Sequence, residues 1–274
     1  MNAKTNRIDQ KFQQKLAQGK KALITFITAG DPDLETTRRL VMAMEEAGAD
    51  LVELGVPYSD PIAEGPVIQA ANTRALKNDV RIDRLFELVS DLRTNPNPSL
   101  KTEIPLLFLL YVNCILQYGK AKFFDKCVEK GIDGLIIPDL PYEESEEIAE
   151  EAVRTGIRLI RLVAPSSNAR IETIAGEAEG FLYCVSSLGV TGTRSSFSTD
   201  FRDFFGRINR FKSAPCAVGF GISSPEQVRE LKEYCDGIIV GSAVVQRIAE
   251  AESPDQAVVS IGKFVKSLRE ALDQ

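Results

Sequence analysis

Two glutamates, Glu53 and Glu64, have the residue type and placement best suited to chemistry in this sequence. Glu53 lies inside a short apolar run, residues 51–54, and Glu64 lies in the polar loop that follows it. Acids at the end of a strand and in the next loop are typical of the catalytic mouth of a parallel α/β protein. Alternation puts Leu51 and Glu53 on one side of the strand. If that side faces the protein interior, burial raises the pKa of Glu53 toward the range useful for proton transfer. The alternative is a solvated glutamate beside an ordinary surface loop.

The chain of 274 residues contains no histidine, and this limits how protons can be moved. A histidine general base, a Ser–His or Cys–His pair and a histidine metal ligand are all excluded. The five cysteines are scattered and lack the spacing of a metal site, so we expect reduced thiols and no bound metal. Acid–base chemistry must therefore come from Asp, Glu, Lys or Tyr side chains.

Glycine-rich segments follow two late predicted strands, at residues 219–223 and 241–242. Backbone N–H groups in such turns, with a helix N-terminus behind Ser242, can cradle an anion without an arginine. Barrel enzymes commonly bind phosphate at these positions. Ordinary tight turns are the alternative, but two such turns at consecutive strand ends favour a phosphate site.

A long loop rich in Gly, Ser and Thr spans residues 186–199. Within it, residues 188–194 have the length and composition of a lid that closes over a substrate. An ordinary surface loop without a function is the alternative.

Apolar runs of strand type alternate with helical patterns along the chain. Asp31 and Pro32 are the expected N-cap and first residue of the helix after the first strand. Eight strands alternating with helices over about 250 residues predict an α/β protein with one closed (β/α)8 barrel, a TIM barrel. Apolar residues at helical spacing from Ile8 to Leu16 add a helix at the N-terminus. The expected strands are residues 22–28, 51–54, 105–111, 134–137, 158–163, 180–185, 216–219 and 237–240.

No linker or composition break divides residues 1–274, so we expect a single domain. An open doubly wound sheet is the alternative architecture, because some of the runs are short. A net charge of −6 and the lack of a basic run argue against a nucleic-acid partner. No segment has the apolar length of a membrane span, and the first 21 residues are polar rather than signal-like. We therefore expect a cytoplasmic protein without a membrane partner.

Four motifs in this order resemble one enzyme family. They are ELGVPYSDPIAEGP at residues 53–66, GVTG at 189–192, GFGIS at 219–223 and GS at 241–242. Together they closely resemble the α subunit of tryptophan synthase, and the similarity runs from residue 23 to the last helices. The resemblance implies a lyase that cleaves indole-3-glycerol phosphate to indole and glyceraldehyde 3-phosphate in a retro-aldol step. It also implies an α2β2 complex with a β subunit that holds pyridoxal phosphate, and no cofactor in this chain.

The same resemblance implies a role for each matching residue. Glu53 would shuttle protons between the indole ring carbon and the glycerol hydroxyl. Glu64 would stabilise the positive charge that develops on the indole nitrogen. The implied pocket residues around the indole are Leu109, Tyr111, Tyr183 and Phe220, with Thr191 in the lid, and the implied phosphate-binding residues are Gly192, Gly221, Gly241 and Ser242.

Glu64 departs from the family pattern, which has aspartate at this position. A longer side chain shifts the carboxylate, and small displacements can be costly in a positioned site. This motivates an alternative function, a weakly active or inactive regulatory α subunit that activates its β partner. A third reading, another sugar-phosphate enzyme on the same barrel, explains the phosphate cradle but not the motif at residues 53–66.

The loop at residues 57–62 is predicted to contact the β subunit. It carries Pro57, Tyr58, Pro61 and Ile62, and exposed apolar residues on a catalytic rim indicate either a pocket wall or an interface. Asp60 lies in the same loop and is expected to serve loop geometry or subunit contact rather than catalysis. Because Glu64 follows this loop directly, a partner that orders the loop would also position the second acid.

Overall fold

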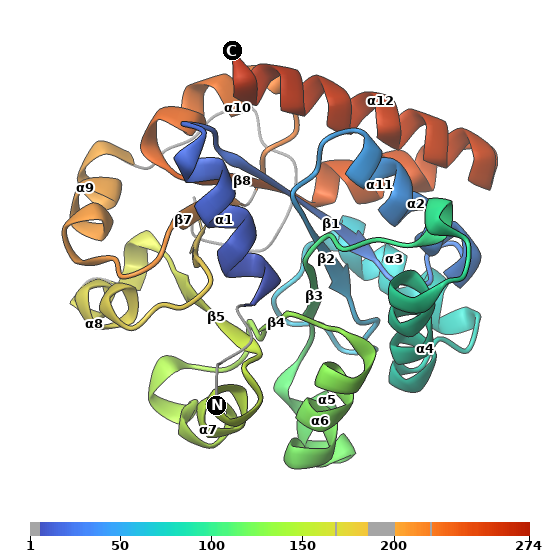
Figure 1. The fold of residues 1–274 in the computed structure, drawn as a ribbon, viewed down its shortest axis with the longest axis horizontal. Helices are drawn as coiled ribbons and strands as arrows, with labels where there is room; N and C mark the ends of the chain where they lie inside the picture. Colours follow the sequence, from blue (N-terminus) through green and yellow to red (C-terminus); the bar gives the residue numbers. More distant parts are fainter. Residues whose placement is uncertain (1–5, 168, 186–200, 220) are drawn as a thin grey trace.

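The computed structural model describes residues 6–167, 169–185, 201–219 and 221–274. Within these ranges, eight parallel strands form a barrel in chain order, and pairing of the last strand with the first closes it (Figure 1). The predicted (β/α)8 barrel is confirmed, and the alternative of an open sheet is wrong. The strands are β1 (Ala22–Thr28), β2 (Leu51–Gly55), β3 (Leu106–Leu109), β4 (Gly134–Ile136), β5 (Arg158–Val163), β6 (Leu182–Val185), β7 (Cys216–Gly219) and β8 (Gly237–Val240).

Helices surround the barrel and cover the outer face of its strands (Figure 1). They are α1 (Arg7–Ala17), α2 (Leu34–Glu46), α3 (Pro66–Lys77), α4 (Ile82–Thr94), α5 (Val112–Tyr118), α6 (Lys120–Lys130), α7 (Glu146–Thr155), α8 (Arg170–Gly176), α9 (Phe201–Phe211), α10 (Pro225–Leu231), α11 (Ser242–Glu250) and α12 (Pro254–Asp273). None of the helices in the described ranges is long and apolar enough to span a membrane.

The predicted N-terminal helix is present as α1, which crosses one end of the barrel in Figure 1. Asn6 caps this helix by accepting the N–H of Ile8, and its side chain also donates to the Asp133 carbonyl at 2.8 Å. Ile8 and Phe12 are buried in the apolar cluster inside the barrel. Gly134 leaves room for this contact, since a Cβ there would lie 2.7 Å from Ile8 Cδ1. Burial of the two side chains stabilises the fold by about 1.5–3 kcal/mol each.

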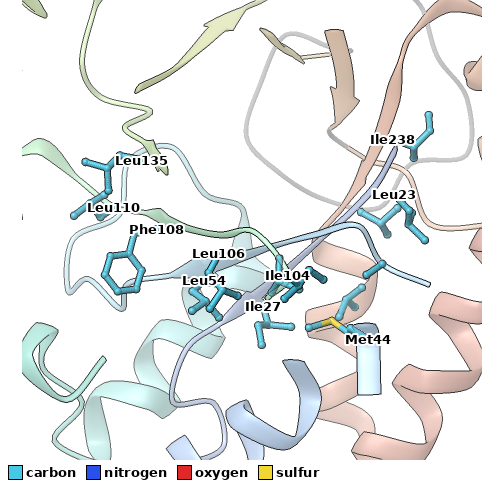
Figure 2. Packing of buried hydrophobic residues seen from close by; sticks show 14 of the residues in the cluster. Leu23, Ile27, Met44, Leu54, Ile104, Leu106, Phe108, Leu110, Leu135 and Ile238 are labelled. Atoms are coloured by element: carbon cyan, nitrogen blue, oxygen red, sulfur yellow. The ribbon is translucent and has the colours of Figure 1, made fainter. Parts of the chain in front are cut away.

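Alternation along the strands separates two apolar layers. Leu51 belongs to the cluster inside the barrel, whereas Val52 and Leu54 pack between the strands and the helices. Figure 2 shows part of this outer layer, where Leu54 lies near Ile27 and Leu106. Because Glu53 has the parity of Leu51, the predicted inward direction of its side chain is confirmed.

The start of α2 corrects one prediction. Asp33, not Asp31, is the N-cap, and its carboxylate accepts the N–H of Thr36 at 2.7 Å. Asp31 is buried and accepts two hydrogen bonds from Arg74 on α3, each 2.8 Å long. That ion pair fixes the Asp31 carboxylate away from the helix end, so Asp33 satisfies the free N–H groups instead.

Candidate active site

Glu53 lies at the centre of β2, where Phe26 on β1 and Leu107 on β3 are its neighbours in the sheet. Its side chain is fully buried, and within the described part of the chain neither carboxylate oxygen has a hydrogen-bond partner. Burial without a compensating partner disfavours the charged form and raises the pKa of Glu53 to about 8. A carboxyl group with this pKa exchanges a proton readily near neutral pH.

Glu64 is also buried, in the loop between β2 and α3. The hydroxyl of Tyr111 donates to Glu64 Oε2 at 2.7 Å and accepts the N–H of Ala63 at 2.9 Å. Burial raises the pKa of Glu64, the hydrogen bond from Tyr111 partly offsets this, and the charge of Asp139 adds to the increase. Tyr58 stacks on Tyr111 with ring centroids 4.7 Å apart. The second acid is therefore fixed by a tyrosine from the loop after β3.

Both acids line one cavity at the carboxyl ends of the strands. Its wall brings together seven of the residues predicted from the sequence: Glu53, Glu64, Leu109, Tyr183, Gly221, Gly241 and Ser242. Tyr111 is not part of the wall and reaches the site through Glu64. The sequence analysis missed further wall residues, namely Phe26, Ala63, Ile68, Ile136, Pro138, Leu162 and Ile239. Alternation could have found Phe26, since it is two residues beyond Ile24 on the inner face of β1.

Residues of the glycine-rich segments line the same cavity as the acids. Gly241 precedes α11, and both Gly241 and Ser242 line the cavity, so the start of this helix lies at the barrel mouth. Gly221 has a φ of +83°, which a residue with a side chain rarely adopts. Gly219 lies so close to Tyr183 that a Cβ would approach the phenol oxygen to 2.8 Å. Amide donors at a helix N-terminus can hold a phosphate here.

Three predicted site residues, Thr191, Gly192 and Phe220, lie outside the described residues, as does the predicted lid at residues 188–194. In the loop after β2, Asp60 is exposed and accepts a hydrogen bond from Ser59. Ile62 is 75% exposed, whereas Pro57 is buried. The expected exposure of Pro57 is therefore wrong, because Pro57 continues the buried segment of Gly55 and Val56, while its contact with a partner stays a prediction.

Four of the five free cysteines are buried, and Cys114 is half-buried. In the part of the chain that the structure describes, no group of three or more Cys, Asp or Glu side chains could hold a metal ion. The described polar side chains in the wall of the cavity are the carboxyl groups of Glu53 and Glu64 and the hydroxyl groups of Tyr183 and Ser242.

The fold and the site define a (β/α)8-barrel protein with two buried carboxyl groups in one cavity at the carboxyl ends of the strands. The family model for the tryptophan synthase alpha chain matches residues 12–273. A tryptophan synthase alpha chain from Thermoanaerobacter sp. (strain X514) is 51% identical over 97% of this chain and 100% of its own length. One from Geobacillus kaustophilus is 47% identical over 90% of this chain and 91% of its own length.

Solved structures that this chain resembles also come from tryptophan synthase. Tryptophan synthase subunit alpha from Legionella pneumophila superposes with a TM-score of 0.87 at 35% identity, covering 98% of this chain and 99% of that one. A chain of Mycobacterium tuberculosis tryptophan synthase has a TM-score of 0.86 at 29% identity, covering 99% and 100%. This chain belongs to the tryptophan synthase alpha chain family, whose role is the cleavage of indole-3-glycerol phosphate.

Proposed function

We propose that this chain performs the family's reaction, the retro-aldol cleavage of indole-3-glycerol phosphate, with Glu53 as the acid–base group. The observation that carries the proposal is the fully buried Glu53 carboxyl, with both oxygens unpartnered and its pKa raised to about 8. Below that pH the group is largely protonated, so it can first donate a proton to the indole ring carbon. The resulting carboxylate then accepts the proton of the glycerol hydroxyl as the carbon–carbon bond breaks.

The remaining groups of the cavity have complementary roles in this proposal. Glu64, held by Tyr111, would face the indole N–H and stabilise the positive charge that develops there. Leu109 and Tyr183 would contact the ring, together with the predicted residues Phe220 and Thr191. Gly221, Gly241 and Ser242, with the predicted Gly192, would bind the phosphate through backbone N–H groups.

The direct test is indole release from indole-3-glycerol phosphate by the purified chain. We expect indole and glyceraldehyde 3-phosphate in equal amounts, with no metal or cofactor added to this chain. Another sugar-phosphate enzyme on the same barrel would convert a different phosphate and release no indole. Absence of indole both alone and with the β subunit would overturn the proposal.

Glu64 favours a second candidate, a regulatory α subunit with weak or no lyase activity. Its carboxylate stands one methylene further from the backbone than the aspartate of the family pattern, yet Tyr111 holds it in place. If the chain is regulatory, its complex with the β subunit uses free indole well but converts little indole-3-glycerol phosphate. Brisk cleavage by the native chain, with little change in Glu64→Asp, would remove this candidate.

We also propose a β subunit as the partner, in a cytoplasmic α2β2 complex whose β subunits carry pyridoxal phosphate. The support is family membership together with the exposed Ile62 and Asp60 on the loop that leads to Glu64. Docking on this loop would fix Glu64 and raise lyase turnover. Indole release should therefore increase on adding the β subunit. The increase should be smaller in Pro57→Gly/Pro61→Gly, since glycine raises the entropy lost when the loop is ordered.

A further inference from the structure

A second cavity lies beside β5, between the segment that follows β4, the strand itself and α8. Its volume is about 350 Å³, and it shares the wall residues Pro138 and Leu162 with the candidate active site. β5 contacts both α7 and α8, and Figure 1 shows the strand between these helices. The cavity is therefore a neighbour of the catalytic cavity but not part of it.

Arg161 is a cation in a layer that is otherwise apolar. Ile160 and Leu162 face the barrel interior, so alternation points Arg161 outward toward the helices. Leu159 and Val163, the other outward residues nearby, belong to the outer apolar cluster. Arg161 is half-buried and lines the second cavity.

The guanidinium of Arg161 has polar neighbours but, among the described residues, no carboxylate in ion-pair contact. Nη1 donates to Ser145 Oγ at 2.6 Å, and the group lies 5.2 Å from the ring centroid of Tyr142. Arg158 on the same strand is the matched contrast, since it pairs with Asp9 at 2.6 Å and with Glu179 at 3.1 Å. A guanidinium presents five donors in a fork that matches an oxyanion, and only one of those of Arg161 is used.

The acids around the cavity are already engaged. Asp139 accepts the N–H of Val112 at 3.0 Å, and Glu143 pairs with Arg170 at 3.4 Å. Glu177 accepts a hydrogen bond from the hydroxyl of Tyr142. A ligand that enters therefore meets the guanidinium groups of Arg161 and Arg170, and it also meets the carboxylate of Asp139, which lines the cavity and has no cation in ion-pair contact among the described residues.

The rest of the wall defines the kind of ligand. Ser167 Oγ accepts the N–H of Ala164 at 3.0 Å, so its own proton can be donated into the cavity. Apart from Asp139, the remaining lining is apolar or aromatic and includes Tyr142, Leu159 and Ile174. A small anion with an apolar body fits both halves of this wall.

We propose that the cavity around Arg161 is an accessory binding site for a small organic oxyanion, a carboxylate or phosphate on an apolar body. The oxyanion lies against the free donors of Arg161, with Ser167 and Arg170 beside it, and the apolar body lies against Tyr142 and Ile174. The site does not depend on the proposed lyase reaction.

Calorimetric titration with benzoate, and separately with inorganic phosphate, tests the site. We expect Arg161→Met to weaken binding of the preferred probe by at least about tenfold, because a charge-assisted bidentate contact is lost. Arg161→Lys should bind the probe with an affinity between those of the wild type and Arg161→Met, since lysine keeps the charge but lacks the forked guanidinium. Arg81→Met is the control, because Arg81 is exposed and pairs only with Asp79. Preference for benzoate identifies a carboxylate ligand, and preference for phosphate identifies a phosphate ester.

A crystal soaked with 4-bromobenzoate gives a second readout that does not require a variant to fold. We expect an anomalous bromine peak between Tyr142 and Ile174, with the carboxylate at Arg161. Binding that is equal in wild type and Arg161→Met, or bromine found only in the cavity of Glu53, would overturn the proposal. Such a result would mean that Arg161 serves only to hold Tyr142 and Ser145.

Discussion

The buried carboxylates at the amino ends of the strands differ from the two that line the candidate active site. At the amino ends of the strands, Asp50, Asp133 and Asp236 directly precede β2, β4 and β8. Each accepts a backbone N–H at the start of the preceding strand and pairs with a cation: Lys15 and Arg269 for Asp50, Arg7 and Arg93 for Asp133, and Lys212 for Asp236. At the carboxyl ends, Glu53 and Glu64 are buried without a cation among the described residues.

The difference shows how one fold assigns different tasks to the same functional group. Burial alone would raise the pKa of Asp236, but Lys212 and the N–H of Cys216 outweigh burial and hold that pKa below its usual value. Glu53 has no such partners, and its pKa is raised to about 8. Asp236 therefore stays charged, whereas the unpaired Glu53 is available for proton transfer.

Replacing the carboxyl group of Glu53, which carries the proton, should have the largest effect on kcat. We expect Glu53→Gln to lower kcat for indole release by about 10²–10⁴-fold, because the amide cannot donate and then accept the proton. Substrate binding should be retained, since the amide has nearly the same shape. Steady-state assays and a binding titration with indole-3-glycerol phosphate measure both quantities. Turnover like that of the wild type would contradict the role of Glu53.

Removing a paired carboxylate at the amino ends of the strands should lower the free energy of unfolding rather than kcat. In the native chain the carboxylate of Asp133 lies 2.8 Å from the buried guanidinium of Arg93, and Asp133→Asn removes this charged partner. We expect the free energy of unfolding to fall by about 3–5 kcal/mol, as when a buried ion pair loses one member. Urea unfolding measures this loss, and kcat of the folded variant should match the wild type. A loss under about 1 kcal/mol would show that this pair contributes little.

Glu53 and Asp236 should also differ in how they make stability depend on pH. The pKa of Glu53 rises from 4.5 to about 8 on folding, so the folded state holds a proton that the unfolded state releases. The stability of the wild type relative to Glu53→Gln should therefore decrease as pH rises from 4.5 to 8, by at most about 1.4 kcal/mol per pH unit. Urea unfolding of both proteins at several pH values between 5 and 8 measures the slope.

Asp236→Asn provides the opposite case. Because folding lowers the pKa of Asp236, its contribution is present above the usual pKa of 3.8 and is lost as pH falls through the folded value. As pH falls, the stability of the wild type minus that of Asp236→Asn should therefore decrease, whereas the stability of the wild type minus that of Glu53→Gln should increase. If both differences change in the same direction, the contrast between Glu53 and Asp236 is wrong.

Local sequence rules predicted the strands and the direction of Glu53 because alternation depends only on neighbouring residues. They failed where a distant residue decides the local structure. The helix α5 was not predicted, since its first N–H group is satisfied by Asp139, which lies 27 residues further along the chain. Likewise, Arg74 determines that Asp33 rather than Asp31 caps α2.

The candidate site divides in the same way. Glu53, Glu64, Gly241 and Ser242 could be predicted, because strand ends in a parallel barrel converge. The contact between Tyr111 and Glu64 joins residues 47 positions apart and depends on side-chain reach, which no spacing rule specifies. The single domain and the roles of Thr191, Gly192 and Phe220 stay predictions.

The smallest effect concerns Tyr111, which is hydrogen-bonded to Glu64 but not to Glu53. Tyr111→Phe removes the hydrogen bond to Glu64 and leaves the N–H of Ala63 without this acceptor. We expect kcat to fall about tenfold, since a hydrogen bond to a charged group contributes about 1.5–3 kcal/mol and part of it also acts in the ground state. KM should change little, because Tyr111 does not line the cavity.

Tyr118→Phe is the matched control, because Tyr118 donates to the exposed Asp83 and lies away from both acids. A double-mutant cycle decides whether Tyr111 acts through Glu64. If it positions that carboxylate, Tyr111→Phe should have almost no further effect on kcat once Glu64→Gln is present. Additive losses would instead mean that Tyr111 contributes independently of Glu64, and the mouth would then hold three separate polar groups rather than one unpaired acid and one acid held by a tyrosine.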